Sequence, residues 1–385
     1  MVAVDCDVAV VGAGPAGSMA AVALLTAAPG LRVTLLDAAD FPRDKTCGDG
    51  IGPDVVDRLA ELGLRDVVDG WKSLRRFDVR FGTAVVRRSL SRPMWVIPRK
   101  VFDARLVEAA TARGATLLKH RVRRLRWGAE GVELDQQVRA RVVIGADGAH
   151  SVVRAAAGAP LSPRHALALR GYTAVPSEGR GVQRVRFSGR RHPSYAWSFD
   201  RGDGLANVGY GELLDPRARP PTRASLLTRL EELLPGSTQS GSGWRGHHLP
   251  LSAWRFSNPQ GRVLLAGDAA GLVNPVTGEG IYYAVTTGML AGAAAATALA
   301  TGDASGAGRR YRHAVRAALA GHLKHVAAAA WLLGRPVLME AGVRAAADDQ
   351  RVFDDLMNMG LGQGRLTAPV LRGLALSAMT RPGPR

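Results

Sequence analysis

The sequence has 385 residues, more than the roughly 250 to 300 at which one hydrophobic core stops growing, so we expect two lobes. Hydrophobic residues make up 46% of the chain and charged residues 22%, a balance that excludes a largely disordered protein. The net charge is +18, but the basic residues are dispersed rather than gathered in runs, which argues against a nucleic-acid-binding arm. This charge fits a solvated basic surface, or attraction of anionic lipid, an acidic electron-donor protein or a diphosphate-bearing substrate.

The cysteines and apolar stretches bear on where the protein works. Cys6 and Cys47 are the only cysteines, too few for a disulfide framework, and neither has metal-ligand spacing. The first predicted strand begins at Val8, which leaves no room before it for a signal peptide. Residues 284–300 are uncharged but built mainly of Ala, Gly and Thr, so we interpret them as a buried helix. We predict a cytoplasmic protein whose contact with a membrane, if any, is peripheral.

The predicted elements suggest two kinds of sheet. The first part of the chain predicts a buried strand at 8–11, a helix at 15–27, a strand at 32–37, alternating antiparallel segments between 77 and 97, a helix at 100–113, and strands at 116–118 and 142–145. The remainder predicts short strands at 182–187, 195–199 and 206–210, a buried strand at 262–266, a helix at 279–300, and a loop at 301–308 before a helical C-terminal region.

A glycine pattern at the first strand–helix turn predicts a dinucleotide site. Gly12, Gly14 and Gly17, with Ala16 among them, form a G-x-G-x-x-G sequence that allows a tight turn and close approach of a pyrophosphate to the helix N-terminus. Asp37 closes the second strand 20 residues after Gly17, where it can accept hydrogen bonds from a ribose 2′-hydroxyl. An acidic residue there disfavours a 2′-phosphate, so FAD or NAD is expected rather than NADP.

Two acidic loops that follow later strands favour FAD. Asp147 stands in a G-A-D-G sequence and Asp268 in a G-D-A-A sequence, and each resembles a signature of flavoproteins. The order of these loops resembles the class that includes aromatic hydroxylases, in which the second Asp lies against the ribityl and pyrophosphate region. Gly280 and Ile281 would place a helix N-terminus at the flavin, where free N–H groups stabilise the negative charge of its reduced form. For Asp147 we also consider that it only organises its own turn.

Three segments make the resemblance to a flavoprotein class more specific. The cysteine-bearing loop 41–50, the N-P-V-T-G-E-G-I sequence at 274–281 and the aromatic segment 195–199 resemble the geranylgeranyl reductase family of FAD-dependent oxidoreductases, within the p-hydroxybenzoate hydroxylase-like superfamily. The family's aromatic motif usually ends in proline, whereas this chain has Asp200, which puts the substrate in doubt. The tryptophan-bearing W-x-W-x-I-P signature of flavin halogenases is absent.

The family resemblance also implies roles for single residues. It places Arg99 against the FAD phosphates, Val122 at the adenine, and Cys47 with Gly48 near the isoalloxazine, where the thiol could gate redox state or relay a proton. The alternative for Arg99 is a surface charge at a helix start, and for Cys47 a small apolar packing residue. Tyr195, Trp197 and Phe199 would share one face of a strand and line an apolar substrate pocket, or else fill a sheet core.

These observations predict an α/β enzyme in three parts. The parts are a Rossmann-like FAD-binding lobe of the ββα, glutathione reductase-like type at 1–75, 98–165 and 255–305, an antiparallel substrate lobe at 76–97 and 166–254, and a helical region at 306–385. The expected reaction is reduction of carbon–carbon double bonds in an isoprenoid or similar apolar substrate, with transient NAD(P)H or an electron-transfer protein as donor. The alternatives are a monooxygenase acting on a secondary metabolite through a C4a-hydroperoxide, and a binding protein without redox function.

Overall fold

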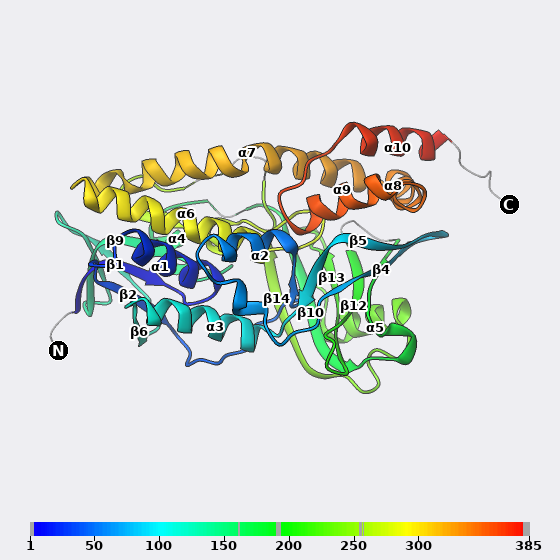
Figure 1. The fold of residues 1–385 in the computed structure, drawn as a ribbon, viewed down its shortest axis with the longest axis horizontal. Helices are drawn as coiled ribbons and strands as arrows, with labels where there is room; N and C mark the ends of the chain where they lie inside the picture. The colour runs from blue at the N-terminus through cyan, green and yellow to red at the C-terminus, as the bar shows by residue number, and fades with distance from the viewer. Residues whose placement is uncertain (1–3, 161, 190–193, 254–255, 257, 380–385) are drawn as a thin grey trace.

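The chain builds two sheets that lie side by side beneath a layer of C-terminal helices (Figure 1). The computed structural model describes residues 4–160, 162–189, 194–253, 256 and 258–379. The predicted lobe ends at residues 1, 254, 255 and 385 lie outside this range. The chain crosses between the sheets several times, so loops that are far apart in the sequence meet where the sheets adjoin.

The first sheet has a parallel centre. Its order is β6 (Thr116–Lys119), β2 (Val33–Asp37), β1 (Val4–Val11), β9 (Val138–Gly145), β8 (Val132–Leu134) and β7 (Leu125–Trp127), with β15 (Val263–Leu265) also paired to β9. The five strands β6, β2, β1, β9 and β15 run parallel. The buried ends of β1, β2 and β9 are continuous apolar runs, as a parallel sheet covered on both faces requires.

Two glycine-rich helices pack closely over this sheet. Helix α1 (Pro15–Ala27) begins directly after the glycine turn, and α6 (Ile281–Ala300) runs along it. A Cβ at Gly288 or Gly292 of α6 would lie 2.2 Å from the backbone oxygen of Ala16 or Ala20, so the approach depends on glycine. By length and composition α6 is the one single helix among the described residues that could cross a membrane, but most of its surface is buried in this packing. Helix α3 (Arg99–Ala112) also packs on α1.

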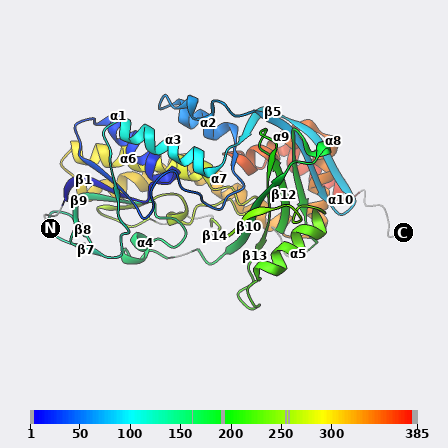
Figure 2. The ribbon, with the colours of Figure 1, turned by 90° about the horizontal axis from the view of Figure 1, so that it is seen from below.

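The second sheet is almost entirely antiparallel. Its order is β14 (Ser242–Pro250), β10 (His165–Ala174), β13 (Leu205–Leu213), β12 (Ser194–Asp200), β11 (Val182–Phe187), β4 (Leu74–Phe81), β5 (Ala84–Val96) and β3 (Gly50–Ile51). The segment from 77 to 97 was expected as short pieces, but it forms one long hairpin of β4 and β5. Figure 2 shows α5 (Arg223–Leu233) on the outer side of this sheet, along β12 and β13.

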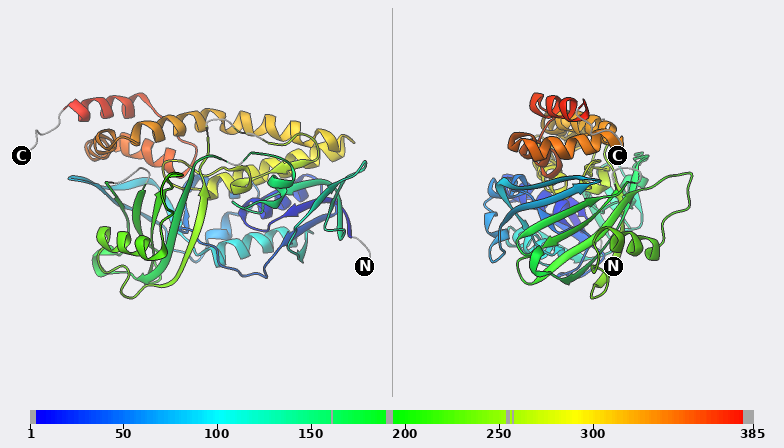
Figure 3. Two further views of the ribbon diagram at one scale, coloured as in Figure 1. Left: turned by 180° about the vertical axis from the view of Figure 1, so that it is seen from behind. Right: turned by 90° about the vertical axis from the view of Figure 1, so that its right-hand side faces the viewer.

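Four helices complete the chain. Helix α7 (Ala307–Leu333) crosses above both sheets, while α8 (Pro336–Asp348), α9 (Gln350–Leu361) and α10 (Ala368–Met379) gather over the second sheet (Figure 3). Met339, Val343 and Phe353 form a hydrophobic core with side chains of β4 and β5. The predicted loop at 301–308 was too long, because a short turn at Ala304–Gly306 leads directly into α7. The helix expected from 279 begins two residues later, at Ile281.

The remaining short elements are α2 (Pro53–Ala60), α4 (Val152–Ala156) and the turns η1 (Arg65–Val68), η2 (Ser177–Gly179) and η3 (Gly267–Ala270).

Candidate functional site

One cavity of about 650 Å³ runs from the N-terminus of α1 to the underside of the C-terminal helices. Its polar end is lined by the glycine turn and by Asp37, Arg99, Asp147 and Asp268. Its other end is apolar and is lined by side chains of the second sheet and of α8 and α9, namely Phe77, Val79, Val86, Met94, Val185, Met339, Val343, Phe353 and Met357. A ligand with a charged portion and an apolar ring therefore fits the polar end, and the apolar end leaves space for a second, apolar molecule.

The glycine turn forms a cradle for an anion. Gly12 has a φ of +97°, and a Cβ there would lie 2.3 Å from the backbone oxygen of Ala146. A Cβ at Gly17 would lie 1.8 Å from the backbone oxygen of Gly12, so the helix can approach the strand only without side chains. Gly14 is the N-cap of α1, and no side chain caps this helix. Its first N–H groups and its positive dipole end are therefore available to a phosphate.

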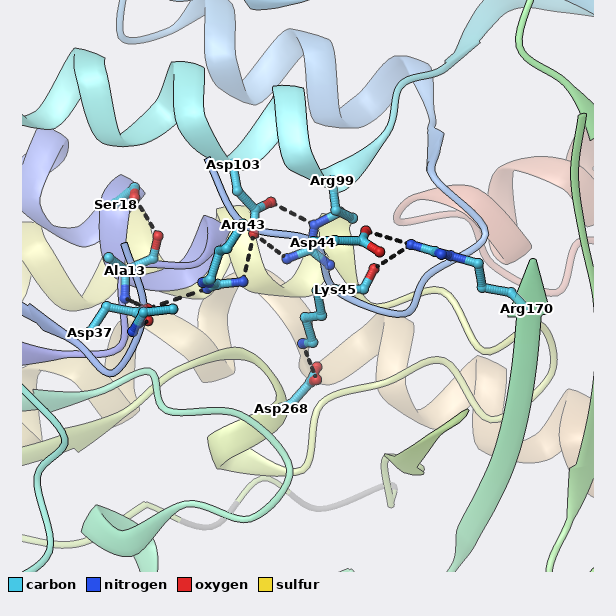
Figure 4. Close-up of polar contacts among 11 residues, drawn as sticks. Ala13, Ser18, Asp37, Arg43, Asp44, Lys45, Arg99, Asp103, Arg170 and Asp268 are labelled. Carbon is cyan, nitrogen blue, oxygen red and sulfur yellow. Dashed lines mark hydrogen bonds and ion pairs between the residues drawn. The ribbon is translucent and has the colours of Figure 1, made fainter. Parts of the chain in front are cut away.

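Asp37 lies beside this turn at the end of β2. Its carboxylate accepts a hydrogen bond of 2.9 Å from the backbone N–H of Ala13 and one of 3.0 Å from that of Ala39. Arg43 approaches the same carboxylate at 3.3 Å (Figure 4). The carboxylate is thus held in place by backbone groups at the cavity wall. Val122, which is buried, lines the cavity on the same side.

Two guanidinium groups converge on the N-terminus of α1. A Cβ at Gly14 would lie 3.4 Å from a nitrogen of Arg43 and 3.9 Å from one of Arg99. Arg99 is only 4% exposed and forms two hydrogen bonds to Asp103, so the alternative of a surface charge at a helix start is wrong. Although burial opposes the charge, the carboxylate of Asp103 raises the pKa of Arg99 above its usual value. The positions of the two guanidinium groups suit a diphosphate.

Asp268 and the start of α6 form the opposite wall. Lys45 donates a hydrogen bond of 3.0 Å to Asp268 (Figure 4). Burial opposes ionisation, but Lys45, together with His247 and Arg99, outweighs it and lowers the pKa of Asp268. A Cβ at Gly280, the N-cap of α6, would lie 3.4 Å from a carboxylate oxygen of Asp268, and no side chain caps the helix from that position. Ile281 is buried as the first residue of α6. A second helix N-terminus thus faces the cavity.

Cys47 is held at the cavity by a buried polar network. Asn207 on β13 donates hydrogen bonds of 2.8 Å to the backbone oxygen of Cys47 and to Oδ2 of Asp49. Tyr172 donates a hydrogen bond of 2.6 Å to the same Asp49 oxygen. Burial raises the pKa of Asp49 to about 6 and raises the pKa of the Cys47 thiol above its usual value. The cysteine is therefore a neutral thiol at neutral pH, with its loop attached to the second sheet.

The three aromatic residues of β12 share the cavity wall. Tyr195, Trp197 and Phe199 all line the cavity, and neighbouring ring centroids lie 5.9 and 6.5 Å apart. Trp197 also donates a hydrogen bond of 2.8 Å to the side-chain oxygen of Asn207. A Cβ at Gly48 would lie 3.4 Å from the ring of Phe199, so the cysteine loop touches this wall. The hydroxyl of Tyr195 donates to the backbone oxygen of Thr277, in the loop before α6.

Glu279 supplies a titratable carboxyl at the junction of the two ends. It lines the cavity, and one of its oxygens accepts a hydrogen bond of 3.0 Å from the backbone N–H of Tyr282 in the first turn of α6. Burial raises the pKa of Glu279 to about 7, against the opposing effect of the backbone N–H groups of Tyr282 and Ile281. Near neutral pH a fraction of the molecules therefore holds a proton on this carboxyl.

Asp147 organises its own turn. It accepts hydrogen bonds of 2.5 Å from the hydroxyl of Ser151 and of 2.7 Å from the backbone N–H of Val152, which begins α4. It also lines the cavity, and burial raises its pKa.

Several residues at this site were not singled out from the sequence. Asn207, Asp49 and Arg43 acquire their roles through contacts with residues in other elements. Glu279 stands inside the segment 274–281, and Arg43 and Asp49 stand inside the loop 41–50, which both resemble family motifs, whereas Asn207 carried no such signal.

The residues present fit an FAD. The glycine turn and the two guanidinium groups match a diphosphate, and the Asp37 carboxylate matches a ribose hydroxyl pair. The start of α6 also lines the cavity, and its positive dipole end matches the electron-rich edge of a reduced flavin.

Comparisons with known proteins agree with this geometry. Residues 5–173 match the family model described as "FAD binding domain". The chain is 34% identical to a menaquinone reductase of Mycolicibacterium smegmatis, over 74% of this chain and 75% of that protein. It is 33% identical to digeranylgeranylglycerophospholipid reductase 1 of Methanopyrus kandleri, over 78% of this chain and 83% of that protein.

Solved structures share the fold. A geranylgeranyl bacteriochlorophyll reductase-like protein of Thermoplasma acidophilum superimposes with a TM-score of 0.79 at 20% identity, covering 98% of both chains. A mutant of the halogenase PltM in complex with FAD superimposes with a TM-score of 0.68 at 15% identity, over 90% of this chain and 78% of that one.

Proposed function

Because this chain belongs to the geranylgeranyl reductase family of FAD-dependent oxidoreductases, and so reduces carbon–carbon double bonds of an isoprenoid or similar apolar substrate, we propose that its substrate is a lipid with a polyprenyl chain, such as an isoprenoid quinone. The observation that carries this proposal is the continuity of the cavity. A cradle for a dinucleotide opens directly into a chamber walled by apolar side chains, where an alkene could lie beside a flavin ring.

We propose that the glycine turn, Ala16, Asp37, Arg99, Val122, Asp268 and the start of α6 hold the FAD. The diphosphate would lie at Gly14, between the guanidinium groups of Arg43 and Arg99. Lys45 would then leave Asp268 and contact a phosphate or the flavin ring. The pair can rearrange because the side chain of Lys45 is 26% exposed and that of Asp268 is 12% exposed. Reduced FAD supplies the hydride when it is bound.

The second sheet and the C-terminal helices would bind the apolar chain. Tyr195, Trp197 and Phe199 present an aromatic wall, and Met94, Met339 and Met357 bring flexible side chains to the same chamber. Methionine adapts its shape readily, which suits a long and flexible ligand. By excluding water the chamber would keep the polyprenyl chain in place and prevent competing reactions.

Addition of hydrogen to an isolated alkene also requires a proton. We propose Glu279 as its donor, because this carboxyl lies between the nucleotide cradle and the aromatic wall and is partly protonated near neutral pH. The thiol of Cys47, which lines the same part of the cavity and is protonated, would relay this proton from Glu279 to the reacting carbon. Tyr195 would orient the loop of Glu279 through its hydrogen bond to Thr277.

The partners are proposed at the level of chemical class. The sequence has no second dinucleotide fingerprint, so NAD(P)H or an electron-transfer protein would bind transiently to reduce the flavin. An isoprenoid lipid resides in a membrane, which implies peripheral contact of the enzyme with that membrane.

An anaerobic experiment tests the proposed reaction. Holoenzyme reduced beforehand is mixed without oxygen with geranylgeranyl diphosphate or an isoprenoid quinone, and the flavin absorbance and the product mass are recorded. We expect reoxidation of the flavin and a product heavier by two hydrogens per double bond. Absence of reoxidation with every polyprenyl substrate would overturn the reductase. Substrate-dependent oxygen consumption with a product heavier by one oxygen would instead establish the monooxygenase.

A further inference from the structure

The outermost helices carry no acidic residues. The sequences of α7 and α10 contain neither Asp nor Glu, although the whole chain has 33 acidic residues. Figures 1 and 3 place both helices on the same outer side of the molecule, above α8 and α9. We call the exposed side chains of α7 and α10, together with the exposed Arg335 just after α7, the cationic face.

Helix α10 exposes apolar side chains on its outer side. Leu371 is 49% exposed and Met379 is 75% exposed, and with the exposed Ala375 they form a stripe at a spacing of four residues. The inner side of the helix is also apolar, with Val370 and Leu374 buried against α8 and α9. An apolar outer stripe of this length is unusual for a helix that faces only water.

Helix α7 adds an aromatic anchor and cations. Trp331, near its end, is 64% exposed, and the guanidinium of Arg335 lies 3.8 Å from the centroid of its ring. Toward the start of α7, Arg316 and Lys324 are exposed, and Arg309 is exposed but pairs with Asp303 at 3.0 Å. A tryptophan beside arginine, with further cations along the helix, is the pattern of helices that lie in a membrane interface.

The acidic residues of the C-terminal region are on the other two helices and, in the case of Asp349, between them. Two of the five face the second sheet, because Glu340 of α8 bonds to Thr83 at 3.2 Å and Asp354 of α9 accepts from the backbone N–H of Ser91 at 3.3 Å. A third, Asp355, accepts from Thr367, in the turn before α10. The charges of these three are engaged within the fold, Asp349 accepts from the backbone N–H of Arg351, and Asp348 is exposed at the end of α8. Because α7 and α10 carry no acidic residue, the cationic face is electrostatically complementary to an anionic surface.

The cationic face also lies directly behind the apolar end of the cavity. A Cβ at Gly342 of α8 would lie 3.4 Å from Leu333 of α7 and 3.4 Å from Leu374 of α10. Leu333 and Gly342 themselves line the cavity. Only one layer of side chains therefore separates α10 from the chamber.

We propose that the cationic face docks on a bilayer of anionic phospholipid. Leu371, Met379 and Trp331 would enter the interface, while Arg316, Lys324 and Arg335 meet the lipid phosphates. This inference rests on the proposed function, because docking would bring the apolar end of the cavity to the membrane in which a polyprenyl lipid resides. A second copy of the chain is a poor occupant, since a symmetric contact would bring two faces of the same charge together.

Vesicle binding tests the proposal independently of catalysis. Holoenzyme is sedimented with vesicles of phosphatidylcholine alone and of phosphatidylcholine mixed with phosphatidylglycerol. We expect binding to the mixed vesicles only, with release at high salt. The double variant Leu371→Glu/Met379→Glu should bind roughly tenfold or more weakly, because two apolar contacts are replaced by repelled carboxylates. Trp331→Glu should also weaken binding.

The matched control is Trp127→Glu on β7 of the first sheet, where the side chain is 52% exposed and the strand lies at the opposite end of the molecule from α10 (Figure 2). It should bind vesicles like the unmodified protein. Reductase activity on detergent-dispersed substrate, measured in parallel, separates failure of docking from failure of the proposed reaction. The proposal is overturned if the protein does not bind mixed vesicles, or if the double variant binds them unchanged. Light scattering that shows a dimer dissociated by the same double variant would overturn it in favour of a second copy.

Discussion

The side-chain nitrogen of Asn207 lies 2.8 Å from the backbone oxygen of Cys47, so a strand of the second sheet holds the cysteine loop that comes from the first. The same side chain accepts the indole N–H of Trp197 and donates to Asp49. Asn207 and Asp49 are fully buried, and each polar group in the set depends on the others. Asn207 is thus a positioning residue that sets the thiol against the aromatic wall.

Replacing Asn207 tests that role. Asn207→Ala leaves the indole N–H and the Asp49 carboxyl without this partner, and we expect the free energy of unfolding to fall by about 1–3 kcal/mol for the buried groups left unsatisfied. Urea titration measures this change in free energy. The Cys47 thiol should also be alkylated faster, which mass spectrometry measures. Asn358→Ala, at an exposed position on α9, is the control and should change neither quantity. Equal alkylation rates in the two variants would argue against a positioning role.

The cysteine itself can be tested by deletion of its sulfur. Cys47→Ala should retain FAD, because the cradle at Gly14 is unchanged, yet lose most turnover with a polyprenyl substrate. Burial keeps the thiol protonated, so the unmodified enzyme should react slowly with iodoacetamide at neutral pH. Cys6→Ala, a buried cysteine outside the cavity lining, is the matched control. Turnover of Cys47→Ala equal to that control would make Cys47 a packing residue.

Glu279 predicts a pH dependence with a definite sign. Its raised pKa, about 7, means that the proton-donating form predominates below that pH and is lost above it. The single-turnover rate of pre-reduced enzyme should therefore decline about tenfold per pH unit on the alkaline side. In Glu279→Gln the rate should be low and nearly independent of pH, while FAD absorbance and substrate affinity persist. An unchanged alkaline decline in this variant would assign the titration to another group.

The glycine turn predicts a sharp contrast between two alanine substitutions. Gly12→Ala places a Cβ 2.3 Å from the backbone oxygen of Ala146 at a φ of +97°, so the turn must move and FAD should be lost. The backbone strain alone is about 1–3 kcal/mol. Gly30→Ala has nothing within 4 Å of the new Cβ and should purify yellow. The ratio of flavin to protein absorbance checks both, and a Gly12→Ala protein with full flavin would contradict the proposed cradle.

The sequence alone was sufficient to predict the local geometry of the glycine turn. The glycine turn, the helix that follows it and the acidic end of β2 lie within about 30 residues, and their geometry depends on local backbone freedom and on apolar runs. The family resemblance extended this to FAD and to the reductase, as the relatives bear out. The length of the β4–β5 hairpin could not be predicted from the sequence, because alternation of polar and apolar residues identifies strands but not the residues at which they end.

Other features were decided only by the tertiary structure. Asn207 meets Cys47 across 160 positions of the chain, and Glu279 becomes a carboxyl with a raised pKa only when α6, the aromatic strand and the cysteine loop enclose it. The arrangement of α7 and α10 on one side likewise follows from which faces of four helices are buried. Local sequence sets the conformation of a segment, but burial and partner identity depend on strand register and on packing between distant segments, and these set the chemistry of a side chain.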